Sequence, residues 1–413
     1  MQRTLKRFSL GFKALPETPK DKILYFNQLF NADPNPKKVN LTVGAYKDEK
    51  GKSWVLPSVL KAIDINRKTI CCDYLPIPGD PAFINEALKL GYGVENGKLA
   101  GVFDRANIAA IQSTSGTGAL NLGVWFLKEY LNLSGNHFYV PMPTWPIYNT
   151  MSAMLGLEVK ALPYYDEKRR VFEFENYLQA LEATPEGSLV SVQVCGHNPT
   201  GHDPSSEQWE KVAQIFARRK FFAVMDMAYQ GFVSGDPEKD NLPVKLFAQK
   251  GIGFILCQSF AKNFGLYGHR VGLVSLPMSS ALDATRAADI IAKRARNIHS
   301  NPPRFGSDVL KTILTSPDLT AEWKKDVKTM ADRIILMRQE FLSTIRAKGQ
   351  EEKWSYIGKQ RGMFAFTHLS EQNVTRLREE FSVHCLPNGR ISIPGLTPEN
   401  VKYVADSILE VTK

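Results

Sequence analysis

The chain lacks the apolar runs of a membrane or secreted protein. No apolar stretch in its 413 residues approaches the roughly 20 residues that a membrane helix needs, and no apolar segment opens the chain as a signal peptide would. We therefore expect no membrane partner. A chain of this length with 43% hydrophobic residues can bury a large core and is long enough for two or more domains.

Cysteine is scarce and basic charge is not concentrated. The five cysteines are an odd number without metal-ligand spacing, so the sequence predicts reduced thiols, an intracellular protein and no metal site. The formal net charge is +10, but 52 basic residues are dispersed among 42 acidic ones, and the chain has no nucleic-acid motif. We expect a basic surface that attracts small anionic substrates, with no nucleic-acid partner.

Apolar and helical segments alternate along the middle of the chain. Strands are predicted at Ile108–Gln112, Phe138–Val140, Leu157–Leu162, Leu189–Val194 and Phe222–Met225, with helices at Ala119–Tyr130, Tyr177–Glu182 and Ser206–Arg219. This order predicts a parallel or mixed sheet with helices on both faces, whose ligands gather beyond the carboxyl ends of the strands. Polar segments follow three of the strands there: His197–Gly201, Asp226–Phe232 and the segment of Lys262.

The stretch Phe254–Gly272 sets a lysine between two apolar runs, Phe254–Cys257 and Val271–Leu276. Lys262 follows Ser259 by three residues and precedes Arg270 by eight, in a loop that Gly265 and Gly268 allow to bend. Desolvation and a neighbouring cation lower the pKa of an amine, so such a lysine could form a Schiff base with a carbonyl cofactor. The same spacing also suits a lysine that ends a strand and points to solvent.

The string SFAKNFGLYGHRVG resembles the cofactor-lysine segment of the aspartate aminotransferase family, the class I pyridoxal-phosphate enzymes of fold type I. Other segments follow in the family's order over nearly the whole chain. The resemblance implies an α/β fold with a large domain, whose mixed and mostly parallel sheet lies between helices, and a smaller α+β domain built from both chain ends. We expect an N-terminal arm and part of the small domain at 1–50, the large cofactor-binding domain at 51–320, and the small domain at 321–413.

The resemblance assigns the cofactor, pyridoxal 5'-phosphate, to a set of residues. Lys262 would hold it as a Schiff base and later move the substrate's α proton. The phosphate would be bound by Ser259, Arg270 and the strand–turn–helix segment Ser113–Gly118, in which Ser115, Gly116 and Thr117 form the main cradle. That segment alone is a weak signal, because helices often begin with Ser, Gly and Thr. The ring would be contacted by Trp145, Asn198, Asp226 and Tyr229, with Asp226 keeping the ring nitrogen protonated.

Other residues would define substrate and assembly. By resemblance, Arg390 binds the α-carboxylate, Asn198 also contacts the substrate carboxylate, and Gly44 borders the substrate. Gly44 lies in the run Val39–Tyr46, which has strand character. Arg296, in RARNIHSNPP, would grip the distal carboxylate of a dicarboxylic substrate from the other subunit, because a guanidinium pairs bidentately with a carboxylate. Tyr74 would reach the cofactor phosphate of the neighbouring subunit. The resemblance therefore implies a homodimer with shared active sites.

The chain departs from the family at Tyr148, three residues after Trp145, where a histidine usually supports the aspartate. A phenol could bond Asp226 directly, leave room for a water, or turn away.

The implied activity is exchange of an amino group between L-aspartate and 2-oxoglutarate by a ping-pong route. An aromatic or broad-specificity aminotransferase on the same scaffold is the nearest alternative, and a binding protein without chemistry is a more distant one. The segment from Phe8 resembles the family's N-terminal arm followed by its first helix. Because only seven residues precede it, we expect the cytoplasm rather than the mitochondrion.

Overall fold

A seven-stranded sheet forms the centre of the fold. The computed structural model describes residues 15, 17 and 21–413, and the strand order is β4-β12-β11-β10-β9-β5-β6. Their bounds are Ile108–Thr114 (β4), His137–Met142 (β5), Glu158–Pro163 (β6), Leu189–Gln193 (β9), Phe222–Met227 (β10), Phe254–Ser259 (β11) and Val271–Pro277 (β12). Only β12 runs antiparallel to its neighbours in this sheet. The predicted mixed and mostly parallel sheet is thereby confirmed.

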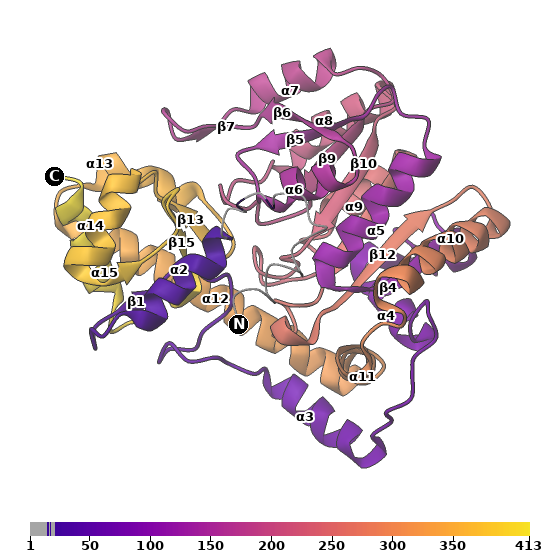
Figure 1. Cartoon of the computed structure of the whole chain (residues 1–413), viewed down its shortest axis with the longest axis horizontal. Helices are drawn as coiled ribbons and strands as arrows, with labels where there is room; N and C mark the ends of the chain where they lie inside the picture. The colour runs from indigo at the N-terminus through magenta and orange to yellow at the C-terminus, as the bar shows by residue number, and fades with distance from the viewer. Residues whose placement is uncertain (1–14, 16, 18–20) are drawn as a thin grey trace, which may run out of the picture.

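Helices cover both faces of this sheet (Figure 1). One face packs against α5 (Ser115–Tyr130), α6 (Ile147–Met154) and α10 (Ala281–His299), and the other against α4 (Pro81–Tyr92), α7 (Phe174–Ala183), α8 (Ser206–Arg218) and α9 (Leu242–Gln249). Alternate residues of β11 point to opposite faces of the sheet. Ile255 and Cys257 belong to the hydrophobic core under α5, α6 and α10, whereas Phe254 and Leu256 belong to the core under α4, α7, α8 and α9. Burial on both faces explains why this strand is a near-continuous apolar run.

A second group of elements comes from both ends of the chain. It contains α2 (Lys22–Ala32), β1 (Val39–Asn40), α13 (Glu351–Trp354), β13 (Phe364–Phe366), α14 (Glu371–Phe381), β14 (Val383–His384), β15 (Arg390–Ser392) and α15 (Val401–Val411). The N-terminal β1 pairs in parallel with β14, and β13 pairs antiparallel with β15. Figure 1 shows this group beside the sheet, with α12 (Pro317–Ala347) running between the two.

The remaining elements are short or peripheral. They are α3 (Pro57–Asn66), α11 (Arg304–Leu314), the hairpins β2–β3 (Val94–Glu95, Lys98–Leu99) and β7–β8 (Tyr165–Asp166, Val171–Phe172), and five 3₁₀ turns at Arg67–Thr69, Arg105–Asn107, Tyr267–His269, Ser355–Lys359 and Ile393–Gly395. No helix in the described part of the chain is long and apolar enough to cross a membrane.

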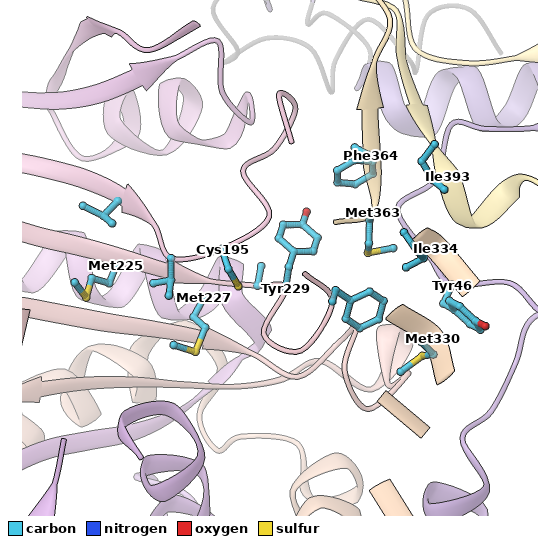
Figure 2. Packing of buried hydrophobic residues seen from close by; sticks show 14 of the residues in the cluster. Tyr46, Cys195, Met225, Met227, Tyr229, Met330, Ile334, Met363, Phe364 and Ile393 are labelled. Atoms are coloured by element: carbon cyan, nitrogen blue, oxygen red, sulfur yellow. The ribbon is translucent and has the colours of Figure 1, made fainter. Parts of the chain in front are cut away.

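One hydrophobic core joins the sheet to the C-terminal elements. Figure 2 shows it continuing from Met227 on β10 through Tyr229 to Met330 on α12 and Phe364 on β13. Tyr229 meets Phe364 edge to face, with ring centroids 5.8 Å apart. The site residues on these elements are therefore held by shared packing.

One prediction near the N-terminus comes out differently. The strand expected from the run Val39–Tyr46 is only Val39–Asn40, because the Asn40 side chain accepts hydrogen bonds from the backbone N–H (3.0 Å) and the hydroxyl (2.6 Å) of Thr42 and turns the chain. The expected arm from Phe8 lies mostly outside the described residues, whereas the helix expected after it is α2.

Candidate active site

The loop between β11 and β12 carries Lys262 and is fixed by packing against α12. The indole N–H of Trp323 donates to the carbonyl of Asn263 (2.8 Å), and the ring of Phe264 stacks on Trp323 at 4.6 Å. Gly265 has φ +64°, and a Cβ there would lie 2.8 Å from Leu56 Cδ1, so the bend needs glycine. These contacts fix the backbone that directly follows the lysine.

Lys262 itself is half-buried beside an aromatic ring and an acid. Its Nζ lies 4.8 Å from the ring centroid of Tyr229. Burial lowers the pKa of Lys262 to about 8; Asp226 opposes this effect, while Arg270 and Arg390 add to it. A substantial fraction of the amine is therefore neutral near physiological pH, as a nucleophile or a proton acceptor requires.

Asp226 lies near the carboxyl end of β10 and accepts a hydrogen bond from Tyr148. The Tyr148 hydroxyl donates to Asp226 Oδ2 at 2.9 Å, and both side chains are buried. Burial raises the pKa of Asp226, whereas Tyr148 and Lys262 lower it; burial and Asp226 raise that of Tyr148 well above its usual value. Of the three arrangements that the sequence left open, the structure has the direct bond.

The turn from β4 into α5 forms a cradle together with Ser259. The hydroxyl oxygens of Ser115 and Ser259 lie 3.0 Å apart, and a Cβ on Gly116 would come within 2.9 Å of Ser259 Cβ. Ser115 has φ +65°, and α5 begins there without a side-chain cap from Thr114. The first N–H groups of α5 are thus not capped by that side chain, and such a helix terminus favours a phosphate.

Thr117 and Arg270 line one hollow of about 560 Å³ next to this cradle, together with Arg294 and His299. Arg270 has φ +49° and is exposed, and it donates to the carbonyl of Tyr267 (3.0 Å). The hydroxyls, helix terminus and cation fit a phosphate group. Together with the adjacent lysine of low pKa, they fit pyridoxal phosphate.

Arg390 is a buried cation next to Asn198. Its Nη1 donates to Asn198 Oδ1 (3.2 Å), its Nη2 donates to the carbonyl of Thr42 (2.9 Å), and its guanidinium carbon lies 4.1 Å from the ring centroid of Phe364. Burial lowers the pKa of Arg390 to about 10, so it remains charged at neutral pH. Its Nε has no partner, and no described acidic side chain forms an ion pair with it. This arrangement suits an external carboxylate.

The remaining predicted residues fall into two places. A Cβ on Gly44 would lie 2.8 Å from Cζ of Phe364, whose ring contacts the Arg390 guanidinium. Trp145 is half-buried against the core that contains Tyr148. Tyr74 (86% exposed) and Arg296 lie on the surface instead.

The two surface residues are linked to each other. Arg296 Nη1 donates to Asn301 Oδ1 (3.1 Å), and Asn301 Nδ2 donates to the carbonyl of Leu75 (2.7 Å), beside Tyr74. Among the described residues no hydrogen bond or ion pair joins Arg296 or Tyr74 to Lys262. The structure therefore brings most of the predicted site together and leaves these two on one exposed face.

Sequence reasoning missed three residues that hold the site. Gln193, the last residue of β9, accepts from the backbone N–H of Asn198 (2.8 Å) and donates to Thr144 Oγ1 (3.1 Å). Thr42 supplies a carbonyl to Arg390, and Phe364 lies against its guanidinium. Only Gln193 carried a signal, as a polar side chain that ends a buried strand. No described cluster of three or more His, Cys, Asp or Glu side chains could hold a metal ion.

The fold and this site agree with the comparisons. The family described as "Aminotransferase class I and II" matches residues 36–408, and the chain belongs to it. "Aspartate aminotransferase, mitochondrial" of Dictyostelium discoideum is 40% identical, with 100% of this chain and 96% of that protein covered. Among solved structures, the aspartate aminotransferase from Saccharomyces cerevisiae cytoplasm has a TM-score of 0.91 at 35% identity, with 98% of both chains covered.

A second solved structure resembles the chain as strongly. It is an aromatic-amino-acid aminotransferase from Burkholderia pseudomallei, described as covalently bound to pyridoxal phosphate, with a TM-score of 0.92 at 36% identity and coverage of 98% of this chain and 100% of that chain. The predicted family and the fold type I architecture are confirmed.

Proposed function

We propose that the protein is a pyridoxal-phosphate-dependent aspartate aminotransferase, which converts L-aspartate and 2-oxoglutarate to oxaloacetate and L-glutamate by a ping-pong route. The observation that carries the proposal is the half-buried Lys262, with a pKa of about 8, placed near Asp226 and within the electrostatic reach of Arg390. Relatives of this name at about 40% identity over the full chain support it.

The cofactor would be held by the residues of the cradle and the loop. Ser115, Gly116, Thr117, Ser259 and Arg270 would bind its phosphate, and Lys262 its carbonyl carbon. Asp226, Asn198, Tyr229 and Trp145 would contact the ring. When bound, pyridoxal phosphate supplies an electron sink for the pair left by the α proton.

The protein's own residues would then divide the work. Arg390 fixes the α-carboxylate and so orients the Cα–H bond. Lys262 Nζ in its neutral form would take the α proton and deliver it to the cofactor's former carbonyl carbon. Asp226, which accepts a hydrogen bond from Tyr148, would keep the ring nitrogen protonated, because a buried carboxylate stabilises a cation beside it.

The amino donor separates the two candidate activities. The resemblance to the aromatic enzyme makes an aromatic or broad-specificity aminotransferase the second candidate. We expect L-aspartate to give a kcat/KM with 2-oxoglutarate well above that of L-tyrosine or L-phenylalanine, measured as oxaloacetate or as the aromatic oxo acid. Comparable values would establish the broad-specificity enzyme, and no turnover with any donor would contradict both.

We also propose a homodimer in which Tyr74 and Arg296 complete the partner's site, Arg296 gripping the distal carboxylate. Their position on one exposed face, away from Lys262, supports this. Mixing the inactive variants Lys262→Ala and Arg296→Ala should restore partial activity, because some mixed dimers then contain one intact site. Proven subunit exchange without activity would contradict shared sites.

The domain boundaries and the compartment remain proposals as well. We propose 1–50 and 321–413 as the arm and small domain and 51–320 as the large domain, and pairing of β1 with β14 supports joining the two ends. We propose the cytoplasm, as for the yeast structure, although the Dictyostelium relative is named mitochondrial. Imaging of the full chain tagged at its C-terminus would decide.

A further inference from the structure

Two adjacent tyrosines lie between the loop that carries Asn198 and the strands that carry Arg390. The Tyr164 hydroxyl donates to the carbonyl of His202 (2.6 Å), and the Tyr164 ring stacks on His197 with centroids 4.4 Å apart. Asn198 directly follows His197. Tyr164 therefore contacts both ends of the segment that contains Asn198.

Tyr165 makes the contact on the other side. Its hydroxyl lies 3.0 Å from Nε2 of His368, and the two rings stack at 5.4 Å with planes 3° apart. Burial, with smaller contributions from Arg170 and His202, lowers the pKa of His368 to about 4, so the imidazole is neutral at physiological pH. We take its Nε2 as the acceptor of the Tyr165 hydroxyl proton. Tyr165 belongs to the β7–β8 hairpin, which Figure 1 shows near the C-terminal elements.

His368 is connected to Arg390 by a short backbone path. Phe366 on β13 pairs with Arg390 on β15, and the carbonyl of Gly389 accepts from both the N–H (3.1 Å) and the hydroxyl (2.7 Å) of Thr367. A Cβ on Gly389 would lie 3.2 Å from the His368 nitrogen. His368 has φ +56°, which is uncommon outside glycine and is held by its surroundings. Movement of His368 would therefore shift the backbone next to Arg390.

A bound carboxylate makes this path important. Arg390 reaches the Asn198 loop directly through one side-chain hydrogen bond of 3.2 Å. A carboxylate on Arg390 competes for the same donors, so that bond cannot by itself fix the spacing of Arg390 and Asn198 in the occupied site. The Tyr165–His368 contact uses none of these donors and can persist.

We propose that Tyr164 and Tyr165 form a bridge that holds the Arg390 strand against the Asn198 loop and thereby sets the affinity for the substrate's carboxylate. Tyr165 is a positioning residue, because it acts through His368. The inference rests on the proposed function for the assignment of the carboxylate to Arg390.

A second contact of the same hairpin supports the bridge. Arg170 Nη1 donates to the carbonyl of Lys353 (3.1 Å), and its guanidinium carbon lies 4.9 Å from the ring centroid of Tyr356. The hairpin thus contacts the C-terminal elements at two points.

The test compares two tyrosine hydroxyl deletions. Tyr165→Phe removes the bond to His368, whereas the control Tyr403→Phe removes a bond to the carbonyl of Phe381 (2.7 Å), which joins α15 to α14 and lies outside the bridge. Succinate serves as the probe, because it carries carboxylates but no amino or oxo group. Its Kd is measured by calorimetry on the protein reconstituted with pyridoxal phosphate, and the thermal unfolding midpoint is recorded in parallel.

We expect Tyr165→Phe to raise the succinate Kd about fivefold, the effect of losing one ordinary hydrogen bond. Tyr403→Phe should shift the unfolding midpoint as much as Tyr165→Phe does and leave the succinate Kd at the wild-type value. His368→Asn tolerates the positive φ but shortens the side chain, so it should also weaken binding. If Tyr165 and His368 act through one contact, the double variant Tyr165→Phe/His368→Asn should have a succinate Kd no higher than that of the single variant with the higher Kd.

The possible outcomes distinguish failure of the proposed bridge from failure of the proposed enzymatic function. If wild type transaminates and binds succinate while Tyr165→Phe and His368→Asn bind it equally well, the bridge is overturned and the enzymatic function stands. A Kd raised equally by Tyr403→Phe also overturns it, because loss of any hydroxyl bond in the C-terminal elements would then weaken binding. A wild type that neither binds succinate nor transaminates overturns both.

Discussion

Replacing Tyr148 with phenylalanine tests the hydrogen bond that the Tyr148 hydroxyl donates to Asp226. The change keeps the ring and removes the donor that lies 2.9 Å from Asp226 Oδ2, and both residues are buried. A hydrogen bond to a charged group contributes about 1.5–3 kcal/mol, so its loss should raise the pKa of Asp226.

The sign of the pH dependence follows from the direction of that shift. Burial already raises the pKa of Asp226 above 3.8 in the folded protein, and Tyr148→Phe raises it further. A carboxyl group with a raised folded pKa destabilises the fold increasingly as pH rises through that pKa, and has little effect at pH values where it is protonated in both states. The free energy of unfolding should therefore fall by about 1.5–3 kcal/mol at pH 7 and by less at pH 4.

Urea unfolding of the cofactor-free protein at these two pH values measures the effect. Tyr177→Phe is the matched control, because Tyr177 is also buried and its hydroxyl forms no hydrogen bond to a described residue. Equal losses of unfolding free energy for Tyr148→Phe at both pH values would refute the reasoning.

In the reconstituted enzyme, Tyr148→Phe should lower kcat by about tenfold to a hundredfold, whereas Asp226→Ala should nearly abolish it. Equal kinetic losses would mean that Tyr148 touches the cofactor itself.

Three further predictions follow from the site. Gly116→Ala should weaken pyridoxal-phosphate binding at equilibrium, because its methyl would meet Ser259 at 2.9 Å, while Gly268→Ala, with no atom within 4 Å, should not. Gly44→Ala should raise the KM for aspartate more than it lowers kcat, because its methyl displaces Phe364 from Arg390; an unchanged KM would contradict this. The rate at which cofactor-free protein captures pyridoxal phosphate should rise with pH with a midpoint near 8, because only the neutral amine reacts, and a midpoint near 10.5 would show that the pKa of Lys262 is not lowered.

The sequence predicted the strands best where burial on both faces leaves near-continuous apolar runs. The run from Val271 to Leu276 became β12 with one more residue at its end. The strand expected from Val39 was too long, because a side-chain bond from Asn40 turns the chain, and apolar pattern does not report such bonds.

The site was predicted through side chains with their own chemistry, such as Lys262 and Asp226. Thr42 escaped because it acts through a carbonyl and meets a residue 348 positions away. The direction in which the Tyr148 side chain points depends on the packing of α6 against β10, and the sequence pattern does not show that packing.

Borohydride reduction followed by peptide mapping tests the central claim most directly. Protein reconstituted with pyridoxal phosphate is reduced, digested and analysed by mass spectrometry. The account predicts the cofactor's mass on the peptide that contains Lys262, and loss of that mass when L-aspartate is added before reduction, because the amino acid releases Lys262 from the cofactor. Cofactor on another lysine, on none, or unaffected by L-aspartate would contradict it.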